Sequence, residues 1–394
     1  MKKIYLEPHF GLHRVLAAGL LALMIALPEP TEAAPPNHQI LIIHSYHSGL
    51  SWTDSVMNGI QDAFARSGID DIQIGAEYLD ARRYTAPEQA RRIQEGIISK
   101  LEGTNPGLVI VSDNAAFDFM LAERNRLFPD APIVFCGVNG FTPAMVENHH
   151  RITGVAEDIS VIETIELVKR LHPGAEEITV IGRTSVAADK ANRDSFAAAL
   201  RGQPAQLKVT YWDDLPLFEL RARLENLKKN SVVFLNGLIT DETGRQLMYG
   251  EATKWASRLS PVPVYSLWDV YLGYGIVGGK LISAYRQGQL AGEMALRILN
   301  GESADRLPVV SAREANQYMF DFRQLKKWDI PLGKLPENAL LVNRPESFYH
   351  KYKYLVWTIL TIGLVLSASV VLLSLAVVRR RKAEGALREK TSEL

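Results

Sequence analysis

Acidic, amide and aromatic side chains follow several short apolar segments of this sequence, each of which has the composition of a buried strand. Such groups at strand ends can hold the ammonium and carboxylate groups of a small solute. The ligand-binding residues predicted on this basis are Ser45, Tyr46, Trp52, Asp113, Asn114, Asn139, Glu157, Asn236, Trp268 and Asp269.

Several of these residues also have an ordinary structural explanation. Ser45 could hold a ligand carboxylate together with a helix N-terminus near Trp52, or it could join Thr53 as a helix cap. Asp113 could pair with a ligand ammonium group or cap the helix expected from Ala115. Both alternatives stay open for each residue.

The same choice between a ligand contact and a structural role applies to two asparagines and to one pair of acidic residues. Asn139 and Asn236 could hydrogen-bond a ligand across a cleft, or they could only occupy Asn-Gly turns. Glu157 and Asp158 lie in a segment expected to cross between two lobes. They could meet an ammonium group or cap the helix expected from Val161.

An indole beside a carboxylate occurs at Trp268 and Asp269, and this pair suits an amino acid or a cationic ligand. Trp52 and Tyr46 would then form the opposite wall of the site. The alternative is a core tryptophan followed by a surface aspartate.

The other chemically capable residues form no catalytic or metal-binding set. His44 and His47 lack a third ligand at metal-site spacing and are expected at the surface or in a loop. Residues 273–278 match a dinucleotide-binding glycine spacing, but no helix should open there, so a close backbone approach is preferred. Cys136 lies in an apolar segment and should be an inert buried thiol. We therefore expect no catalysis, no cofactor and no bound metal.

Strand-like and helix-like segments alternate along most of the chain, which predicts parallel sheets covered by helices on both faces. The strands expected are 39–44, 72–79, 108–111, 133–136, 178–181, 207–212, 232–235, 262–265, 307–310 and 318–322. The helices expected are 52–65, 86–101, 115–127, 161–171, 187–200, 217–228, 243–257 and 282–299, the last returning to the first lobe. The fold class predicted is α/β, with two doubly wound parallel-sheet lobes around a cleft.

Two apolar segments flank this region. The first follows a basic N-terminus and resembles a secretory signal, cleaved or retained as an anchor. The second, 354–378, carries no charge, and the basic cluster 379–382 after it predicts a cytoplasmic C-terminus. The parts predicted are a signal peptide 1–34, a two-lobed domain 37–343 (lobe 1 at about 37–140 and 280–322, lobe 2 at about 158–268), a stalk 344–353, a transmembrane helix 354–378 and the start of a cytoplasmic signalling helix 379–394.

The charge balance and the cysteine content each exclude one feature. Basic and acidic residues number 44 each, so no basic face for nucleic acid is expected. A single cysteine excludes an intramolecular disulfide.

Several segments, in order, resemble the ABC-transporter substrate-binding-protein-like sensor domain of bacterial sensor histidine kinases and related membrane receptors. They are 44–49 with 52–53, 112–115, 132–139, 154–157, 275–279, 322–326 and 343–349. The resemblance covers nearly all of residues 39–353. It implies a type I periplasmic-binding fold related to proteins that take aromatic or other small amino acids.

The function expected is that of an extracytoplasmic small-molecule sensor, anchored in the bacterial inner membrane, whose lobes close on ligand and signal through one helix. A homodimer is expected, with a kinase or cyclase output module on the same or another chain. The alternatives are a tethered transport receptor that delivers a solute such as an amino acid to a permease, and a hydrolase on the same fold.

Overall fold

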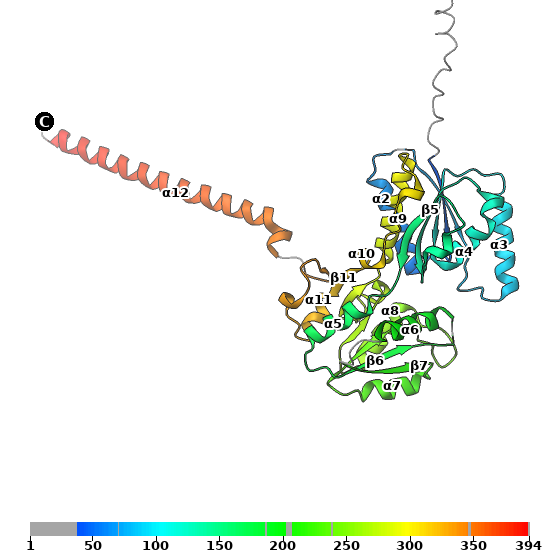
Figure 1. The fold of residues 1–394 in the computed structure, drawn as a ribbon. Coiled ribbons are helices and arrows are strands. Elements are labelled where there is room, and N and C mark those ends of the chain that lie inside the picture. The colour runs from blue at the N-terminus through cyan, green and yellow to red at the C-terminus, as the bar shows by residue number, and fades with distance from the viewer. Residues whose placement is uncertain are drawn as a thin grey trace, which may run out of the picture. The chain divides into compact units, whose positions relative to one another are not determined.

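The computed structural model describes residues 38–69, 71–185, 187–201, 207–237, 239–345 and 348–392. The described chain forms two compact units, each shown in Figure 1. The first contains the residues up to Ser160 together with Trp268–Val270 and Leu281–Gln317, and the second contains Val161–Leu267, Tyr271–Lys280 and the residues from Tyr318 onward. The predicted signal peptide, 1–34, lies outside the described residues.

A five-stranded parallel sheet forms the centre of the first unit. Its order is β2-β1-β3-β4-β5, with β1 Gln39–His44, β2 Gln73–Tyr78, β3 Leu108–Ser112, β4 Ile133–Asn139 and β5 Ile152–Glu157. Every position of β3 is buried, because helices cover both faces of the sheet. These helices are α2 Ser51–Ala65, α3 Pro87–Leu101, α4 Asp113–Leu127 and α9 Ala284–Leu299.

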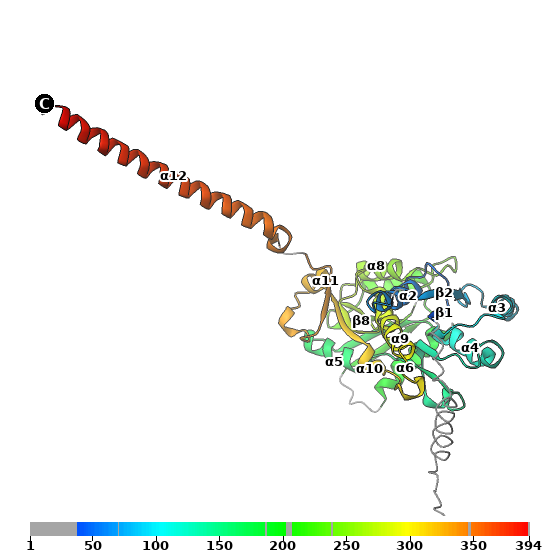
Figure 2. The same ribbon diagram turned by 90° about the horizontal axis from the view of Figure 1, so that it is seen from above.

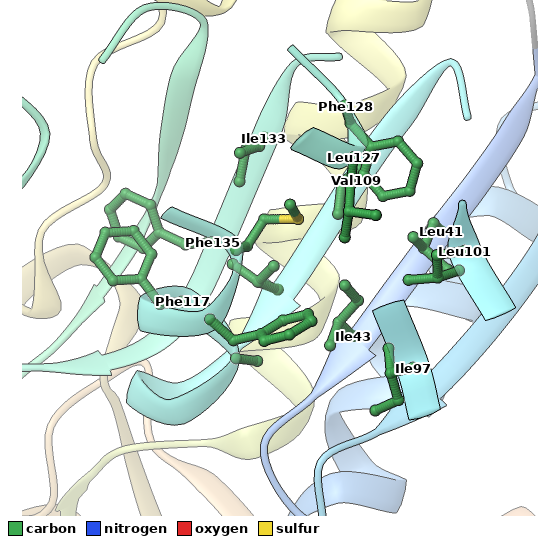
Figure 3. Packing of buried hydrophobic residues seen from close by; sticks show 14 of the residues in the cluster. Leu41, Ile43, Ile97, Leu101, Val109, Phe117, Leu127, Phe128, Ile133 and Phe135 are labelled. Atoms are coloured by element: carbon green, nitrogen blue, oxygen red, sulfur yellow. The ribbon is translucent and has the colours of Figure 1, made fainter. Parts of the chain in front are cut away.

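Alternate side chains of the central strands fill the layer between the sheet and helices α3 and α4. Ile43, Val109 and Phe135 share this face because successive strand residues point to opposite sides. Figure 3 shows them with Phe117 of α4, whose ring meets the ring of Phe135 edge-on at a centroid distance of 5.2 Å. Burial of these apolar side chains is the main stabilising contribution to the layer.

On the other face, α2 and α9 lie side by side, as Figures 1 and 2 show. Glycines allow this close approach. A Cβ atom on Gly59 would lie 2.1 Å from the carbonyl oxygen of Tyr285, and one on Gly288 would lie 2.0 Å from that of Val56. Small residues at the contact therefore position α9 against α2.

The second unit contains a four-stranded parallel sheet in the order β7-β6-β8-β9. Its strands are β6 Glu177–Gly182, β7 Lys208–Asp213, β8 Ser231–Leu235 and β9 Val264–Ser266, and its helices are α5 Val161–Leu171, α6 Ala187–Leu200, α7 Leu217–Glu225 and α8 Tyr249–Leu259. The rings of Phe196, Phe234 and Tyr265 pack together in its core. With the first unit, this sheet confirms the predicted α/β class with parallel sheets.

The helix predicted at 243–257 begins later, at Tyr249. The Asp241 carboxylate accepts hydrogen bonds from the backbone N–H groups of Thr243 and Arg245. It thus holds these residues in a turn that competes with a helix. The start predicted from the sequence was therefore wrong.

Shorter elements complete the chain. A three-stranded sheet has the order β10-β11-β12, with β10 Gly278–Leu281, β11 Gln317–Asp321 and β12 Leu340–Val342. The short helices are η1 Pro143–Val146, η2 Asp269–Tyr271, η3 Ala304–Arg306, α10 Ala312–Ala315, α11 Phe322–Lys327 and η4 Leu332–Lys334. The strand predicted at 307–310 is wrong, since only Val310 forms a bridge, to Val155.

The last element is the long helix α12, Phe348–Ser392, with non-helical backbone angles at Tyr352. Within the described residues it is the one helix long and apolar enough to cross a membrane, over Lys351–Gly385. The predicted apolar segment 354–378 lies inside it. The long apolar C-terminal helix expected from the sequence is therefore present.

Candidate functional site

The carboxyl ends of the parallel strands in the first unit bring several predicted residues to one edge of the sheet. His44 pairs with Ser112 at the ends of β1 and β3, and Asn139 pairs with Glu157 at the ends of β4 and β5. Asp113 follows β3 directly. This edge is where parallel α/β sheets bind ligands.

Asp113 is a buried carboxyl held in an unusual backbone conformation. Its φ is 67°, and its side chain accepts a hydrogen bond at Oδ1 from Trp52 Nε1 at 2.9 Å. Its Oδ2 is buried without a partner. Burial raises the pKa of this carboxyl to about 7. The N-cap of α4 is Ser112, whose side chain makes no cap hydrogen bond, and Asp113 is the first residue of the helix, so the capping alternative for Asp113 is wrong.

Glu157 repeats this arrangement at the end of β5. Its Oε1 accepts a hydrogen bond from Trp268 Nε1 at 3.2 Å, and its Oε2 is buried without a partner. Burial, followed by the negative charge of Asp113, raises the pKa of Glu157 well above its ordinary value. Glu157 is the last residue of β5, and the chain passes into the second unit three residues later, after Ser160.

Two indole–carboxyl pairs, drawn from four separate segments, therefore lie in one unit. Trp52 is 6% exposed and Trp268 is 8% exposed. An indole N–H only donates, so each indole hydrogen-bonds one carboxyl oxygen, and the other oxygen is left without a partner. Among the described residues, no lysine or arginine forms an ion pair with Asp113 or Glu157.

Gly137 lies against the Asp113 carboxyl, and Gln287 forms a hydrogen bond with Gly137. Gly137 has a φ of 67°, and a Cβ atom there would lie 3.1 Å from Asp113 Oδ1. Gln287 of α9 accepts from the N–H of Gly137 and donates to the carbonyl of Ala156. The sequence reasoning missed Gln287. The one sequence feature that could have indicated Gln287 is its position as a polar residue on the face of a predicted helix that otherwise carries small residues.

The side chains of two predicted ligand residues, Ser45 and Asn114, are occupied by structural hydrogen bonds. Ser45 Oγ accepts from the backbone N–H of Ala116 in the first turn of α4, not in α2 as the capping alternative proposed. The Asn114 amide accepts from the N–H of Asn139 and donates to its carbonyl. These bonds position α4 and the end of β4 around the carboxyl of Asp113.

Asp269 also has a structural role. Burial raises the pKa of its carboxyl to about 6, while hydrogen bonds from Ser283 and the backbone N–H of Ala284 act in the opposite direction. These donors begin α9, so Asp269 holds the start of that helix. Its negative charge also contributes to the raised pKa of Glu157.

His44 departs from the prediction. It is fully buried, its Nδ1 lies 2.8 Å from Ser112 Oγ, and its ring stacks on Tyr78 at 5.3 Å. Burial lowers its pKa to about 4, so the ring is neutral at pH 7. The expectation of a surface or loop histidine was wrong for His44, because it is the last residue of a strand covered on both faces.

Tyr46, in the loop after β1, is partly exposed. Asn236 belongs to the second unit. It follows β8, is 1% exposed, and has no partner for either amide atom. Nearby, at the carboxyl ends of β6 and β7, the unit has a cavity of about 660 Å³ lined by Ile181, Trp212 and Phe218, among others.

The glycine segment before β10 makes the close approach expected of it. A Cβ atom on Gly275 would lie 2.0 Å from Ser257 Oγ, and one on Gly278 would lie 2.1 Å from the carbonyl oxygen of Met319. Among the described residues, no group of three or more His, Cys, Asp or Glu could hold a metal ion. Burial raises the pKa of the Cys136 thiol well above its ordinary value, which leaves it unreactive.

The sequence profile of the family described as ABC transporter substrate binding protein matches residues 47–340. A ligand-free, open substrate binding protein with adhesive properties from Clostridium difficile has a TM-score of 0.56 at 19% identity, over 78% of this chain and 99% of that one. A domain from Streptococcus pneumoniae in complex with L-Trp has a TM-score of 0.54 at 17% identity, over 78% and 100%.

A conserved domain protein from Vibrio cholerae is similar to the same degree, with a TM-score of 0.54 at 16% identity over 77% of this chain and 99% of that one. At these identities the likeness shows the fold, which is that of periplasmic substrate-binding proteins. A comparison with curated protein sequences finds no match.

Proposed function

Because the chain belongs to the ABC transporter substrate binding protein family, we propose that it binds a small organic solute at the carboxyl edge of its first sheet. Asp113 and Glu157 receive a positively charged group of that solute. One observation carries this proposal: each carboxyl is buried, fixed by one indole, and left with one oxygen without a partner.

The energetic reason is the cost of burying polar groups. A buried acceptor without a donor costs about 1–3 kcal/mol, and more when it is charged. A ligand ammonium group would supply N–H donors and a compensating charge to both oxygens, and charge-assisted bonds are the stronger kind. Each carboxyl has an indole beside it, Trp52 at Asp113 and Trp268 at Glu157, which suits a cation with an apolar body.

An amino acid or an amine with an aromatic or aliphatic side chain fits these requirements. The Streptococcus domain, solved with L-Trp, supports this ligand class because tryptophan carries an ammonium group. The family supports a binding protein rather than an enzyme.

We further propose that the binding units lie outside the cytoplasmic membrane of a bacterium and that α12 anchors them there. The uncharged segment 354–378 would extend over about 37 Å as a helix, enough for a hydrocarbon core of about 30 Å. The basic cluster Arg379–Lys382 supports a cytoplasmic C-terminus. The domain boundaries predicted from the sequence, including the stalk 344–353, are part of this proposal.

The proposed output is a signal passed through α12. The observation that favours signalling is that α12 continues as a helix beyond the basic cluster to Ser392, as a rod that transmits motion would. A homodimer and a cytoplasmic kinase or cyclase partner belong to this proposal. The competing output is delivery of the solute to a permease by a tethered transport receptor.

Cysteine crosslinking separates the two outputs. Cys136 is the single cysteine of the sequence and is buried, so Ala383→Cys introduces one accessible thiol on the helix after the basic cluster. A signalling dimer should form an Ala383→Cys disulfide in membranes, at a rate that changes with ligand. A ligand-independent rate would favour delivery.

A thermal-shift screen tests the binding proposal. The full chain in detergent is screened with amines, amino acids and neutral or anionic compounds of matched size. A ligand at a hundredfold excess over Kd should stabilise the folded protein by about 2.7 kcal/mol. Hits should carry a cationic group and be lost in Asp113→Asn, while Asp130→Asn, an exposed control in the same unit, keeps them. Hits confined to neutral or anionic compounds would contradict the proposal.

A further inference from the structure

The two carboxyls of the site are buried, and no lysine or arginine of the described residues forms an ion pair with either. Asp113 and Glu157 are each 3% exposed, and each accepts a hydrogen bond from a tryptophan indole. An indole carries no formal charge, so neither bond neutralises a carboxylate. Ionising two buried carboxyls that repel each other costs a large free energy. One of the two therefore takes up a proton.

The strands packed against the pair supply no positive charge. On β1, the pKa of His44 is lowered to about 4 by burial, so its ring is neutral at pH 7. On β4, the pKa of the Cys136 thiol is raised by burial and then by the charges of Asp113 and Glu157. These neighbours are therefore neutral under ordinary conditions.

The remaining elements add negative charge or none. Asp158, after β5, and Asp269, in η2, both raise the pKa of Glu157. On α2, the negative charge of Asp54 acts on His44. On α9, Gln287 is neutral, and the guanidinium of Arg286 is directed to Glu293 at 3.7 Å.

We propose that Asp113 and Glu157 hold one proton between them in the ligand-free protein and release it to solvent when the cationic group of a ligand binds. This inference rests on the proposed function, because it takes the same two carboxyls as the cation site. The proton leaves one carboxyl oxygen and the ligand cation takes its place, so the charge of the site is the same before and after binding.

Competition between proton and ligand makes affinity depend on pH. Where the pair is protonated, each unit of pH increase removes a competing proton and raises the affinity for a cation by up to about tenfold. The dependence disappears at higher pH, where the proton is already lost. A neutral compound of the same shape would show no such increase.

Infrared spectroscopy of the ligand-free full chain in detergent tests the proton directly. A protonated carboxylic acid has a carbonyl stretch that a carboxylate lacks. At about pH 6, below the pKa of about 7 of Asp113, this band should be present in the parent and in Asp130→Asn. It should be weaker in the double variant Asp113→Asn with Glu157→Gln, in which the remaining band comes from other protonated carboxyls such as Asp269, whose pKa is raised to about 6. A parent without the band, or a double variant that keeps all of it, would overturn the proposal.

Calorimetry with tryptamine, a cation that carries an indole, tests the exchange. Titrations at about pH 6 in two buffers of different ionisation enthalpy should show about one proton released per tryptamine bound. Binding without proton release would overturn the exchange and leave the proposed function standing. Failure of tryptamine to bind at any pH, with the infrared band present, would overturn the cation site itself and the exchange with it.

Discussion

Replacing Asp113 with asparagine should change how the stability of the first unit depends on pH. Burial raises the pKa of this carboxyl from its ordinary value of 3.8 to about 7. The folded protein therefore keeps a proton that the unfolded chain loses. The resulting contribution to stability is fully present below about pH 4 and is lost as the pH rises through 7. A difference of about three pKa units corresponds to roughly 4 kcal/mol.

Other groups of the unit titrate in the same range, so only a comparison with the parent isolates Asp113. The pKa of Asp269 is raised to about 6, and its contribution has the same sign. The pKa of His44 is lowered to about 4, so its contribution is present above about pH 6.5 and is lost as the pH falls. The contributions of Asp269 and His44 are common to parent and variant and cancel in the difference, which then reports Asp113 together with its effect on the pKa of Glu157.

Urea unfolding followed by tryptophan fluorescence gives this difference at about pH 4 and about pH 8. The stability of Asp113→Asn relative to the parent should rise by roughly 4 kcal/mol between them. The exposed control Asp130→Asn should show a constant difference. A constant difference for Asp113→Asn as well would refute a raised pKa at this position.

Three further changes test the packing, the site and the anchor. Gly288→Ala should destabilise the first unit by about 1–3 kcal/mol in urea, because its Cβ meets a backbone carbonyl of α2; Gly96→Ala, in open space on α3, should be neutral or stabilising by up to about 1 kcal/mol. Trp268→Phe removes the donor to Glu157, so calorimetry should show the pH dependence of tryptamine binding moved to higher pH. Replacing Arg379–Lys382 with serine should scramble the orientation in membranes, as measured by protease protection of the folded units.

The strands were largely predictable from the sequence. The segment predicted at 39–44 is the strand Gln39–His44, because a strand buried on both faces is a continuous apolar run. Where a side chain redirects the backbone, the pattern fails. The Asp241 turn delays α8, and the segment before Val310 makes no strand.

The site was predictable by residue type and position but not by partner. Asp113 was identified as a polar residue that follows a strand, and Glu157 as a polar residue of a segment crossing between the lobes. Their donors are 61 and 111 residues away in the chain, and only the fold brings them together. Asn114 and Asp269 are also polar residues at such positions, yet hydrogen bonds to neighbouring segments occupy their side chains. No sequence pattern separates these two cases.

The affinity of the strongest cationic hit from the screen, measured by calorimetry, tests the central claim most directly. Parent protein and Asp130→Asn should bind it with the same Kd. The double variant Asp113→Asn with Glu157→Gln should bind it at least about 30-fold more weakly. Removing the carboxylates leaves the ligand cation buried without a negative partner, which costs about 2 kcal/mol or more of binding free energy. A double variant with the Kd of the parent would show that the ligand binds elsewhere.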